Sequence, residues 1–436
     1  MFPLAAEQSS MLFLEGLFGP GIFHNVSMGT PVAAGVGAAE VAAAVDRLSS
    51  RHELLRSTSV GSWSGVQAVR QASPGLVRVA TGAEDPLDSF VRRRNELHNV
   101  PLDPERARFE LLEADGDTPR YLLGMFAHLV CDGQSAAILK DDLNSLLAGG
   151  ELTPLVPLAE FWKSREITDQ ARAAELRHWR SALSGCPPID SFMPRSADRS
   201  GYVRSQVDRE TPGGGAHAVL RVLVEDLRAT AFSVVAALLA VAVWRRSGRT
   251  AFLLHTPVST RRGDTARAMA GNFVLDRPIP CRIDPDQRFA DLVRRVHADV
   301  FNGLRRAGLS VPELACAVPE YGGALAGEGA DYLQLHVDLQ SGDGVEAVNS
   351  PGGSTGVVRL GKFEPAGDIT VSTLRFRFSE SRLFTRTFSG GPPEGIERVE
   401  ELRADVLAML HATDLHEGAV GALAQAADRA RKDEIV

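Results

Sequence analysis

The spacing of apolar and polar positions predicts short strands and amphipathic helices along the whole chain. Apolar or alternating runs of strand length occupy residues 23–32, 121–126, 251–258, 332–340, 369–378 and 383–388. Apolar positions recur with helical spacing in residues 37–50, 134–147, 160–183, 229–246 and 289–304. Both halves of the chain contain strands and helices of this kind, which predicts a mixed α/β fold built from two similar lobes.

The boundary between the lobes is predicted from length and composition. With 436 residues the chain exceeds the usual size of a single core, so two lobes of roughly 150 to 250 residues are expected. Residues 186–215 combine several prolines with the glycine run 213–215 and show little periodicity. We therefore place an N-terminal lobe in residues 1–185 and a C-terminal lobe in residues 186–436.

Composition narrows the class of protein. Hydrophobic residues make up 44% and charged residues 23%, and no apolar run approaches the roughly 18 residues that a membrane-spanning helix needs. The N-terminus lacks the basic start and apolar stretch of a secretory signal, so a cytoplasmic location is expected. The net charge of -8 comes without a basic block, which argues against a nucleic-acid or membrane partner. The four cysteines show no Cys-x-x-Cys spacing, so neither a metal site nor a disulfide framework is expected.

The candidate chemistry lies in residues 127–133, Ala-His-Leu-Val-Cys-Asp-Gly, where a predicted strand gives way to a predicted helix. A histidine at a strand end is either catalytic or, more often, structural. Asp132 either orients the imidazole of His128 or forms an ion pair that fixes the turn, and Gly133 supplies the freedom for a sharp turn. A His-x-x-x-Asp-Gly string occurs by chance in about one of twenty such sequences, so alone it does not decide between these roles. Cys131 is expected to be a small buried side chain rather than a nucleophile.

Six short motifs occur in order along the chain. Besides residues 127–133 they are Phe2-Pro-Leu-Ala-Ala-Glu-Gln8, Arg51-His-Glu-Leu-Leu-Arg-Ser57, Pro101-Leu-Asp-Pro104, Thr256-Pro-Val-Ser-Thr-Arg261 and Gly271-Asn-Phe-Val274 with the segment that follows it. In content and order they resemble the motifs of the condensation-domain family of nonribosomal peptide synthesis. That family belongs with chloramphenicol acetyltransferase among the His-x-x-x-Asp acyltransferases, and the resemblance covers nearly the whole chain.

The resemblance implies a fold and roles for the motif residues. The fold would be a V-shaped pair of chloramphenicol-acetyltransferase-like α/β lobes, a pseudo-dimer with a substrate tunnel between the lobes and His128 near its middle. His128 would act as general base or position the nucleophile, which suits an imidazole because its ordinary pKa is about 6.5. The aspartate is structural in this family, so Asp132 would pair with an arginine, for which motif position favours Arg261. The Gly133 backbone N–H would stabilise the oxyanion.

Several positions depart from the family pattern. Ala127 stands where the family usually has a first histidine, which is generally the less critical of the pair. Ser341 replaces an asparagine whose amide would reach the tunnel. His336 and Asp338 are unusual, and they either line the acceptor side of the tunnel or form a solvated strand face. The motif also lacks the second aspartate and the serine of heterocyclisation domains, so ring formation is not expected.

The resemblance also implies the substrates and partners. An acyl or aminoacyl group would arrive as a thioester on the 4′-phosphopantetheine arm of a carrier protein, and a small-molecule amine, or less often an alcohol, would accept it. No cofactor is expected on the chain itself. The sequence contains neither an adenylation domain nor a carrier segment, so either a free-standing enzyme that meets its carrier in trans or an excised domain is expected. Residues 92–94 or Arg305 and Arg306 are either carrier contacts or parts of solvated helix faces. Two alternatives stay open: a module that recruits a partner without catalysis, and an acyltransferase that uses coenzyme A.

Overall fold

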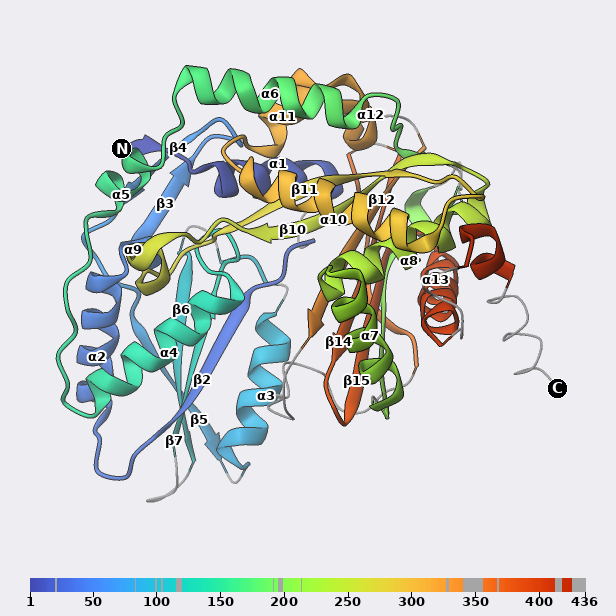
Figure 1. The fold of residues 1–436 in the computed structure, drawn as a ribbon. Helices are drawn as coiled ribbons and strands as arrows, with labels where there is room; N and C mark the ends of the chain where they lie inside the picture. Colours follow the sequence, from blue (N-terminus) through green and yellow to red (C-terminus); the bar gives the residue numbers. More distant parts are fainter. Residues whose placement is uncertain are drawn as a thin grey trace.

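Both expected lobes are present in the computed structural model of the chain (Figure 1). Each lobe is built on a β-sheet with helices packed against it, so the α/β prediction is confirmed. The structure describes residues 1–19, 22–82, 84–98, 100–102, 105–114, 120–190, 192–194, 199–212, 214–326, 329–339, 356–366, 368–411 and 418–425.

The N-terminal lobe consists of a four-stranded sheet and its flanking helices. These elements are β2 (Val26–Val32), α2 (Ala38–Arg51), β5 (Leu76–Gly82), α3 (Pro86–Leu97), β6 (Ala107–Ala114), β7 (Arg120–Phe126) and α4 (Gly133–Leu147). The strand order is β2-β7-β6-β5, and only the β5–β6 pair is parallel. Strand β7 is buried on both faces, because Leu122 and Phe126 pack with α2 and α4 while Leu123 and Met125 pack with the end of α3. This two-sided burial explains why β7 is a continuous apolar run rather than an alternating one.

The C-terminal lobe contains the larger sheet. Its elements are β8 (Ile189–Asp190), β9 (Val203–Pro212), α7 (Gly214–Leu227), α8 (Ala231–Ser247), β10 (Ala251–Ser259), β11 (Val274–Arg282), α10 (Phe289–Arg305), β12 (Ala330–Leu339), β13 (Val358–Lys362), β14 (Ile369–Phe378), β15 (Arg382–Gly391) and α13 (Gly395–Leu410). The strand order is β11-β10-β12-β14-β15-β9-β13, with β8 beside β12. The strands predicted at 369–378 and 383–388 are confirmed as the antiparallel pair β14 and β15.

Helix α8 forms the centre of the C-terminal lobe. Its residues from Val234 to Val243 are all fully buried, among side chains of α10, α13 and the sheet. Its nearly continuous apolar character is therefore that of a core helix. Within the described ranges no single helix is long and apolar enough to span a membrane; α7 and α8 meet that criterion only as a pair, and the pair is bent by 102°.

The two lobes exchange segments. Helix α1 (Ala6–Phe18) precedes the N-terminal sheet, yet Leu14 and Phe18 are buried in a cluster with Tyr332 of the C-terminal sheet, and the Phe18 and Tyr332 ring centroids are 4.9 Å apart. In the other direction, the connection from β10 to β11 buries Phe273 in a cluster with Ala127 of the N-terminal lobe. The remaining elements are β1 (Phe2–Pro3), η1 (Glu53–Arg56), β3 (Ser57–Val60), β4 (Val66–Val69), η2 (Arg199–Gly201), α9 (Gly263–Ala268), α11 (Val311–Ala317) and α12 (Pro319–Ala326).

One expectation about the middle of the chain is wrong. In place of one helix over residues 160–183, the structure has α5 (Leu158–Ser164) and α6 (Asp169–Leu183). Thr168 caps the start of α6, where its Oγ1 accepts a hydrogen bond from the Ala171 N–H at 3.2 Å, so a capping residue interrupts the apolar pattern. Residues 186–215, which show little periodicity in the sequence, contain β8, β9 and the start of α7. The division of the lobes at residue 185 stays a prediction.

Candidate active site

His128 lies in a turn that follows an inner strand of the N-terminal sheet. Strand β7 ends at Phe126, and the Val130 N–H closes the turn by donating to the Ala127 carbonyl oxygen at 3.0 Å. Helix α4 then begins at Gly133. The predicted passage from strand to helix at the motif is confirmed, and it holds His128 at the end of a strand that is buried on both faces.

Gly133 is the first residue of α4, and its φ is not positive. The expectation that this glycine supplies the turn with conformational freedom is therefore wrong. A Cβ atom added at Gly133 would meet no atom within 4 Å, so the space beside the residue is open. The first N–H groups of a helix have no acceptor inside the helix, which leaves the Gly133 N–H able to bind an oxygen atom of a ligand.

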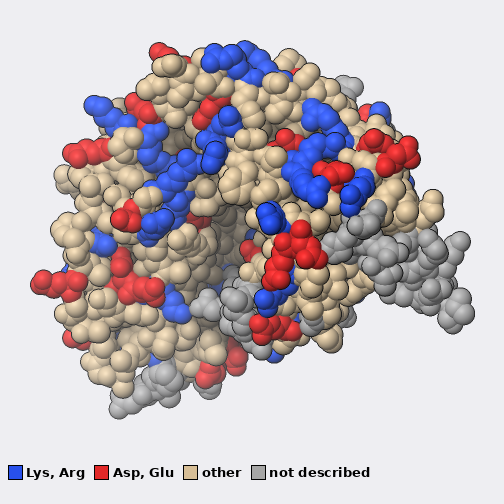
Figure 2. Space-filling view, in the orientation of Figure 1, with Lys and Arg blue, Asp and Glu red and all other residues tan. Residues whose placement is uncertain are grey.

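Two cavities meet at His128. The first, which we call the C-side cavity, has a volume of about 230 Å³ and is walled by side chains of β11, β12, β14 and β15. The second, the N-side cavity, has a volume of about 320 Å³ and includes Ala127 and Leu129. Met11, Phe23 and His128 line both cavities. His128 therefore stands between two spaces. The molecular surface is also hollowed between the two lobes (Figure 2).

The imidazole of His128 is neutral. Burial lowers its pKa below the ordinary 6.5; the polar backbone of His128 itself and the Asp132 carboxylate act in the opposite direction, and the Arg375 charge adds to the lowering. The Nδ1 atom is buried without a hydrogen-bond partner among the described residues. The Phe23 ring meets the imidazole edge-on, with 6.3 Å between the ring centroids. A neutral, partly buried imidazole beside two cavities is chemically suited to accept a proton from a bound ligand.

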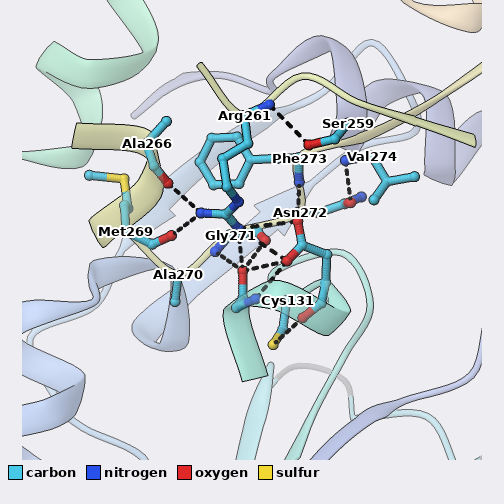
Figure 3. A network of polar contacts seen from close by, with 12 residues as sticks. Cys131, Ser259, Arg261, Ala266, Met269, Ala270, Gly271, Asn272, Phe273 and Val274 are labelled. Atoms are coloured by element: carbon cyan, nitrogen blue, oxygen red, sulfur yellow. Dashed lines mark hydrogen bonds and ion pairs between the residues drawn. The ribbon is translucent and has the colours of Figure 1, made fainter. Parts of the chain in front are cut away.

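Asp132 is the centre of a buried polar network that joins the lobes. Figure 3 shows the part of this network around Arg261, Gly271 and Phe273. Its Oδ1 accepts a hydrogen bond from the Ser135 N–H at 2.7 Å, and its Oδ2 accepts one from the Phe273 N–H at 3.0 Å. An Arg261 guanidinium nitrogen lies 3.1 Å from Oδ1, and the Arg261 and Asp132 side chains are 2% and 6% exposed. The Gly271 N–H donates to the Ser135 hydroxyl at 2.9 Å. Of the two roles that the spacing left open for Asp132, the geometry corresponds to the ion pair that fixes the turn.

Arg261 extends this network along residues 260–274, which we call the crossing segment. Its Nη1 donates to the carbonyl oxygens of Ala266 and Met269, the second at 2.6 Å. Its guanidinium carbon lies 4.1 Å from the centre of the Phe273 ring. Burial lowers the pKa of Arg261 and the Asp132 carboxylate opposes that shift, but a guanidinium stays charged at any cellular pH. The crossing segment is thereby held against the N-terminal lobe through the start of α4.

His52 makes a second link between the lobes, which the sequence reasoning missed. Its Nε2 lies 2.8 Å from Asp142 Oδ2, and its Nδ1 accepts a hydrogen bond from the Ala270 N–H at 3.1 Å. The ring therefore carries its proton on Nε2. Burial lowers the pKa of His52, while the Asp142 carboxylate acts to raise it, and a proton on Nδ1 would break the contact with Ala270. The available signal was the Arg-His-Glu motif itself, whose histidine no local pattern explains.

His336 lies in the wall of the C-side cavity, together with His128. Its Nδ1 lies 3.2 Å from an Arg375 guanidinium nitrogen, which can only donate, so Nδ1 accepts and Nε2 carries the proton. The Nε2–H then donates to Gln334 Oε1 at 2.9 Å. Burial lowers the pKa of His336 well below its ordinary value, with Arg375 acting in the same direction, so the ring is neutral. The side chain is thus tied into a polar chain across the sheet.

The remaining sequence candidates differ in their positions. Asp338 is half exposed, and its carboxylate lies 3.8 Å from Arg377, which corresponds to the solvated-face alternative. Ser341 lies outside the described residues. Ala127 lines the N-side cavity and packs in the interlobe core. Cys131 is fully buried, and burial raises the pKa of its thiol well above the ordinary value, as befits a packing residue.

The fold and the family motifs together define the class of this protein. Two α/β lobes with a His-x-x-x-Asp-Gly turn between them form the two-lobe pseudo-dimer of the chloramphenicol acetyltransferase-like fold, and solved condensation domains have the same fold. The sequence profile of the family described as Condensation domain matches residues 1–320. The chain belongs to the condensation domain family. Condensation domains of nonribosomal peptide synthetases are amide- or ester-forming enzymes of the acyltransferase type.

Individual relatives are distant. Phosphinothricin tripeptide synthetase PhsC of Streptomyces viridochromogenes is 26% identical over 340 residues, which is 72% of this chain and 30% of that synthetase. The solved structure of holo-AB3403, a four-domain nonribosomal peptide synthetase bound to AMP and glycine, matches with a TM-score of 0.73 and 16% identity over 97% of this chain and 33% of that one. The complex of the X-domain and OxyB from teicoplanin biosynthesis matches with a TM-score of 0.69 and 19% identity over 98% and 93%. The chain thus spans less than a third of the synthetase PhsC.

Proposed function

We propose that this chain joins a carrier-bound acyl or aminoacyl thioester to a small-molecule amine or, less often, an alcohol. The observation that carries the proposal is the neutral imidazole of His128 at the meeting point of two cavities. Two substrates that enter from opposite sides reach the same ring in such an arrangement. The donor would arrive on the 4′-phosphopantetheine arm of a carrier protein, and the acceptor would occupy the C-side cavity.

His128 would serve as the base in the reaction. The imidazole takes the proton from the acceptor as its nitrogen or oxygen attacks the thioester carbonyl, and a C–N or C–O bond forms. The carbonyl oxygen then carries a negative charge, which the Gly133 N–H at the start of α4 would stabilise. As the tetrahedral intermediate collapses, the C–S bond breaks and the imidazolium returns its proton to the leaving thiolate. The lowered pKa of His128 supports this role, because it keeps the ring unprotonated at neutral pH.

Asp132 and Arg261 would act as positioning residues rather than as proton carriers. The Asp132 carboxylate is occupied by Ser135, Phe273 and Arg261. Removing it would therefore alter the seating of α4, and with it the position of the Gly133 N–H relative to His128.

For the carrier, we infer that the arginines near the crossing segment are the better docking surface. An open cavity of about 610 Å³ is lined by Arg262 and Arg305, on a face where Figure 2 shows Lys and Arg side chains gathered over α9 and α10. Arg92 and Arg93, the other candidates, are already paired with Glu84 and Glu110 at 3.0 and 2.7 Å. Acidic carriers gain more from cations that are not already paired.

The proposal is tested with an acyl-loaded carrier protein and a panel of amine and alcohol acceptors. Product and unloaded carrier are followed by intact-protein mass spectrometry, with the same acyl group supplied in parallel on coenzyme A. His128→Ala should lower turnover by about 10²- to 10⁴-fold. His178→Ala, at a histidine that lines neither cavity at His128, is the control and should not change it. Full turnover by the His128 variant would overturn the assignment of the base.

Ala127 supports a second candidate function. Where the family has its first histidine, this chain has a methyl group in the wall of the N-side cavity. The structural match to the X-domain, which was solved in complex with OxyB, motivates a module that recruits a partner enzyme without catalysis. Capture of a defined tailoring enzyme, together with no product from any loaded carrier, would favour this candidate. A single condensation product would eliminate it.

A further inference from the structure

Asp276 is a buried carboxyl group in the wall of the C-side cavity. It lies on β11, is 6% exposed and shares the cavity with His128. Its Oδ1 accepts a hydrogen bond from the Arg277 N–H at 3.1 Å. Its Oδ2 is buried and accepts no hydrogen bond of ordinary geometry in the part of the chain that the structure describes, although the Gln334 side chain lies close enough to act on the carboxyl group. Burying a carboxylate oxygen without a donor is unfavourable, so a ligand that supplies one would be bound with a gain in free energy.

The protein does not supply a cation to this carboxylate. The neighbouring Arg277 turns its guanidinium to the carbonyl oxygens of Asp276 and Leu309, and no ion pair to the Asp276 side chain occurs among the described residues. Burial raises the pKa of Asp276 to about 7. The Gln334 side chain and the charge and backbone N–H of Arg277 act to lower this pKa. The group is therefore ionised in mildly alkaline solution, and a nearby positive charge would keep it ionised at lower pH.

Of the other charged side chains of the cavity, Glu7 and Arg386 are already paired, while Arg375 is a buried cation that donates to His336 Nδ1 at 3.2 Å. Glu7 lies 2.6 Å from Arg165, and Arg386 lies 2.7 Å from Asp208. Of the carboxyl groups among the described lining residues, Asp276 is thus the one whose charge is not balanced by an arginine.

The rest of the wall defines the shape of an occupant. A chain of hydrogen bonds from Arg375 through His336 to Gln334 fixes the Gln334 side chain, which acts to lower the pKa of Asp276. The remaining lining is largely apolar and includes Met11, Leu14, Phe18, Val274, Val371 and Phe388. A compact apolar or aromatic body with one polar end would bury its body against these residues and leave its polar end at the carboxylate.

From this juxtaposition we propose that Asp276 binds a basic nitrogen of the acceptor, so that the acceptor substrates of this chain are compact apolar or aromatic amines. The inference rests on the proposed function, because it assigns the C-side cavity to the acceptor. It adds a charge requirement that His128 alone does not impose. Before attack, one ammonium proton passes to the Asp276 carboxylate, and His128 takes the second proton from the neutral amine as the C–N bond forms.

The test compares two probes of nearly equal shape, 2-phenylethylamine and 2-phenylethanol. Binding of each probe is measured by ligand-detected NMR titration at about pH 8, where a primary amine is protonated and Asp276 is ionised. The wild-type chain should bind the amine about tenfold more tightly than the alcohol. Asp276→Asn keeps the size of the side chain and should abolish this preference while leaving alcohol binding unchanged. Because the substitution removes a buried charge that has no partner, the variant should unfold at the same temperature as wild type or above it.

Asp299→Asn is the matched control. Burial raises the pKa of Asp299 too, but this residue lies on α10 and does not line the cavity, so the preference for the amine should persist. The inference would be overturned if wild type bound the two probes equally or did not bind the amine. It would also be overturned if folded Asp276→Asn kept the preference for the amine. Binding is measured without a donor, so a failure of condensation chemistry would leave this result intact. The His128→Ala chain should still bind the amine.

Discussion

Replacement of Asp132 by asparagine should loosen the link between the lobes while preserving the shape of the side chain. In the folded protein one carboxylate oxygen accepts from the Ser135 N–H and the other from the Phe273 N–H. Asparagine must place its NH₂ group at one of these two positions, where it meets another donor. One buried N–H then loses its acceptor, and Arg261 loses its counter-charge.

The size of the effect follows from the burial of the pair. The Arg261 and Asp132 side chains are 2% and 6% exposed, so water cannot replace either partner. Removing one member of a buried ion pair costs about 3–5 kcal/mol, and a buried N–H without an acceptor costs about 1–3 kcal/mol. The two losses overlap because the same oxygen atoms are involved. We therefore expect the free energy of unfolding to fall by about 3–5 kcal/mol.

The measurement is urea unfolding followed by the fluorescence of Trp162, whose ring centroid lies 5.6 Å from that of Phe273 in the crossing segment. Adding Arg261→Met removes the stranded cation, so the double variant should lose less stability than the sum of the single variants. Asp291→Asn, in an exposed pair with Arg294, is the control and should have little effect. A loss under about 1 kcal/mol for Asp132→Asn, or strictly additive losses, would refute the coupling.

Three further predictions concern activity and pH. Gly133→Pro should still fold, because proline suits the first position of a helix and Asp132 before it is already extended (φ -104°, ψ 177°). Because the substitution removes the N–H that would bind the oxyanion, turnover should fall by about 10²- to 10³-fold. Gly133→Ala keeps the N–H and should retain turnover; equal activity of the two variants would contradict the oxyanion role. Because burial lowers the pKa of His128, the acid limb of kcat/KM for an alcohol acceptor, which does not itself titrate in this range, should have its midpoint below the ordinary 6.5, and a midpoint above that value would count against His128 as the base. Burial also lowers the pKa of His255 to about 3, so below about pH 6.5 the unfolded chain binds more protons than the folded one, and the free energy of unfolding falls towards pH 3. His255→Phe should reduce the difference between the free energies of unfolding measured in urea at about pH 7 and at about pH 4.5. An unchanged difference would argue against this role of His255.

Local pattern was sufficient to locate His128. The apolar run of β7, buried on both faces, and the capping residue Asp132 at the start of α4 are both signals carried within a few residues. The break between α5 and α6 was missed although it is also local, because Thr168 caps a helix inside a stretch whose apolar spacing hardly changes. Element types were thus easier to predict than their ends.

Contacts between the lobes could not be predicted from spacing. Arg261 was proposed as the partner of Asp132 only from its place in a family motif, and nothing in periodicity links positions so far apart in the chain. The contact of His52 with Ala270 depends on how the crossing segment lies against the N-terminal lobe, which is a property of the whole fold. The sequence did contain an indication of Asp276, because Asp276 and Arg277 are adjacent charged residues in the otherwise apolar strand β11. Such an interruption of an apolar strand often marks a functional position.

The exchange of segments between the lobes limits how this scaffold can be recombined. A chimera that joins residues 1–185 of one parent to the remainder of another inherits a foreign crossing segment, so Asp132 and His52 must bind the second parent's backbone. It also packs helix α1 of the first parent against C-terminal core residues of the second parent. A chimera could instead take residues 260–274 from the parent of the N-terminal lobe and α1 from the parent of the C-terminal sheet. The contacts of the crossing segment with Asp132 and His52, and those of α1 with the C-terminal core, would then each come from one parent. To transfer an acceptor specificity, segments that contact one another should therefore be taken from the same parent, even where they are far apart in the sequence.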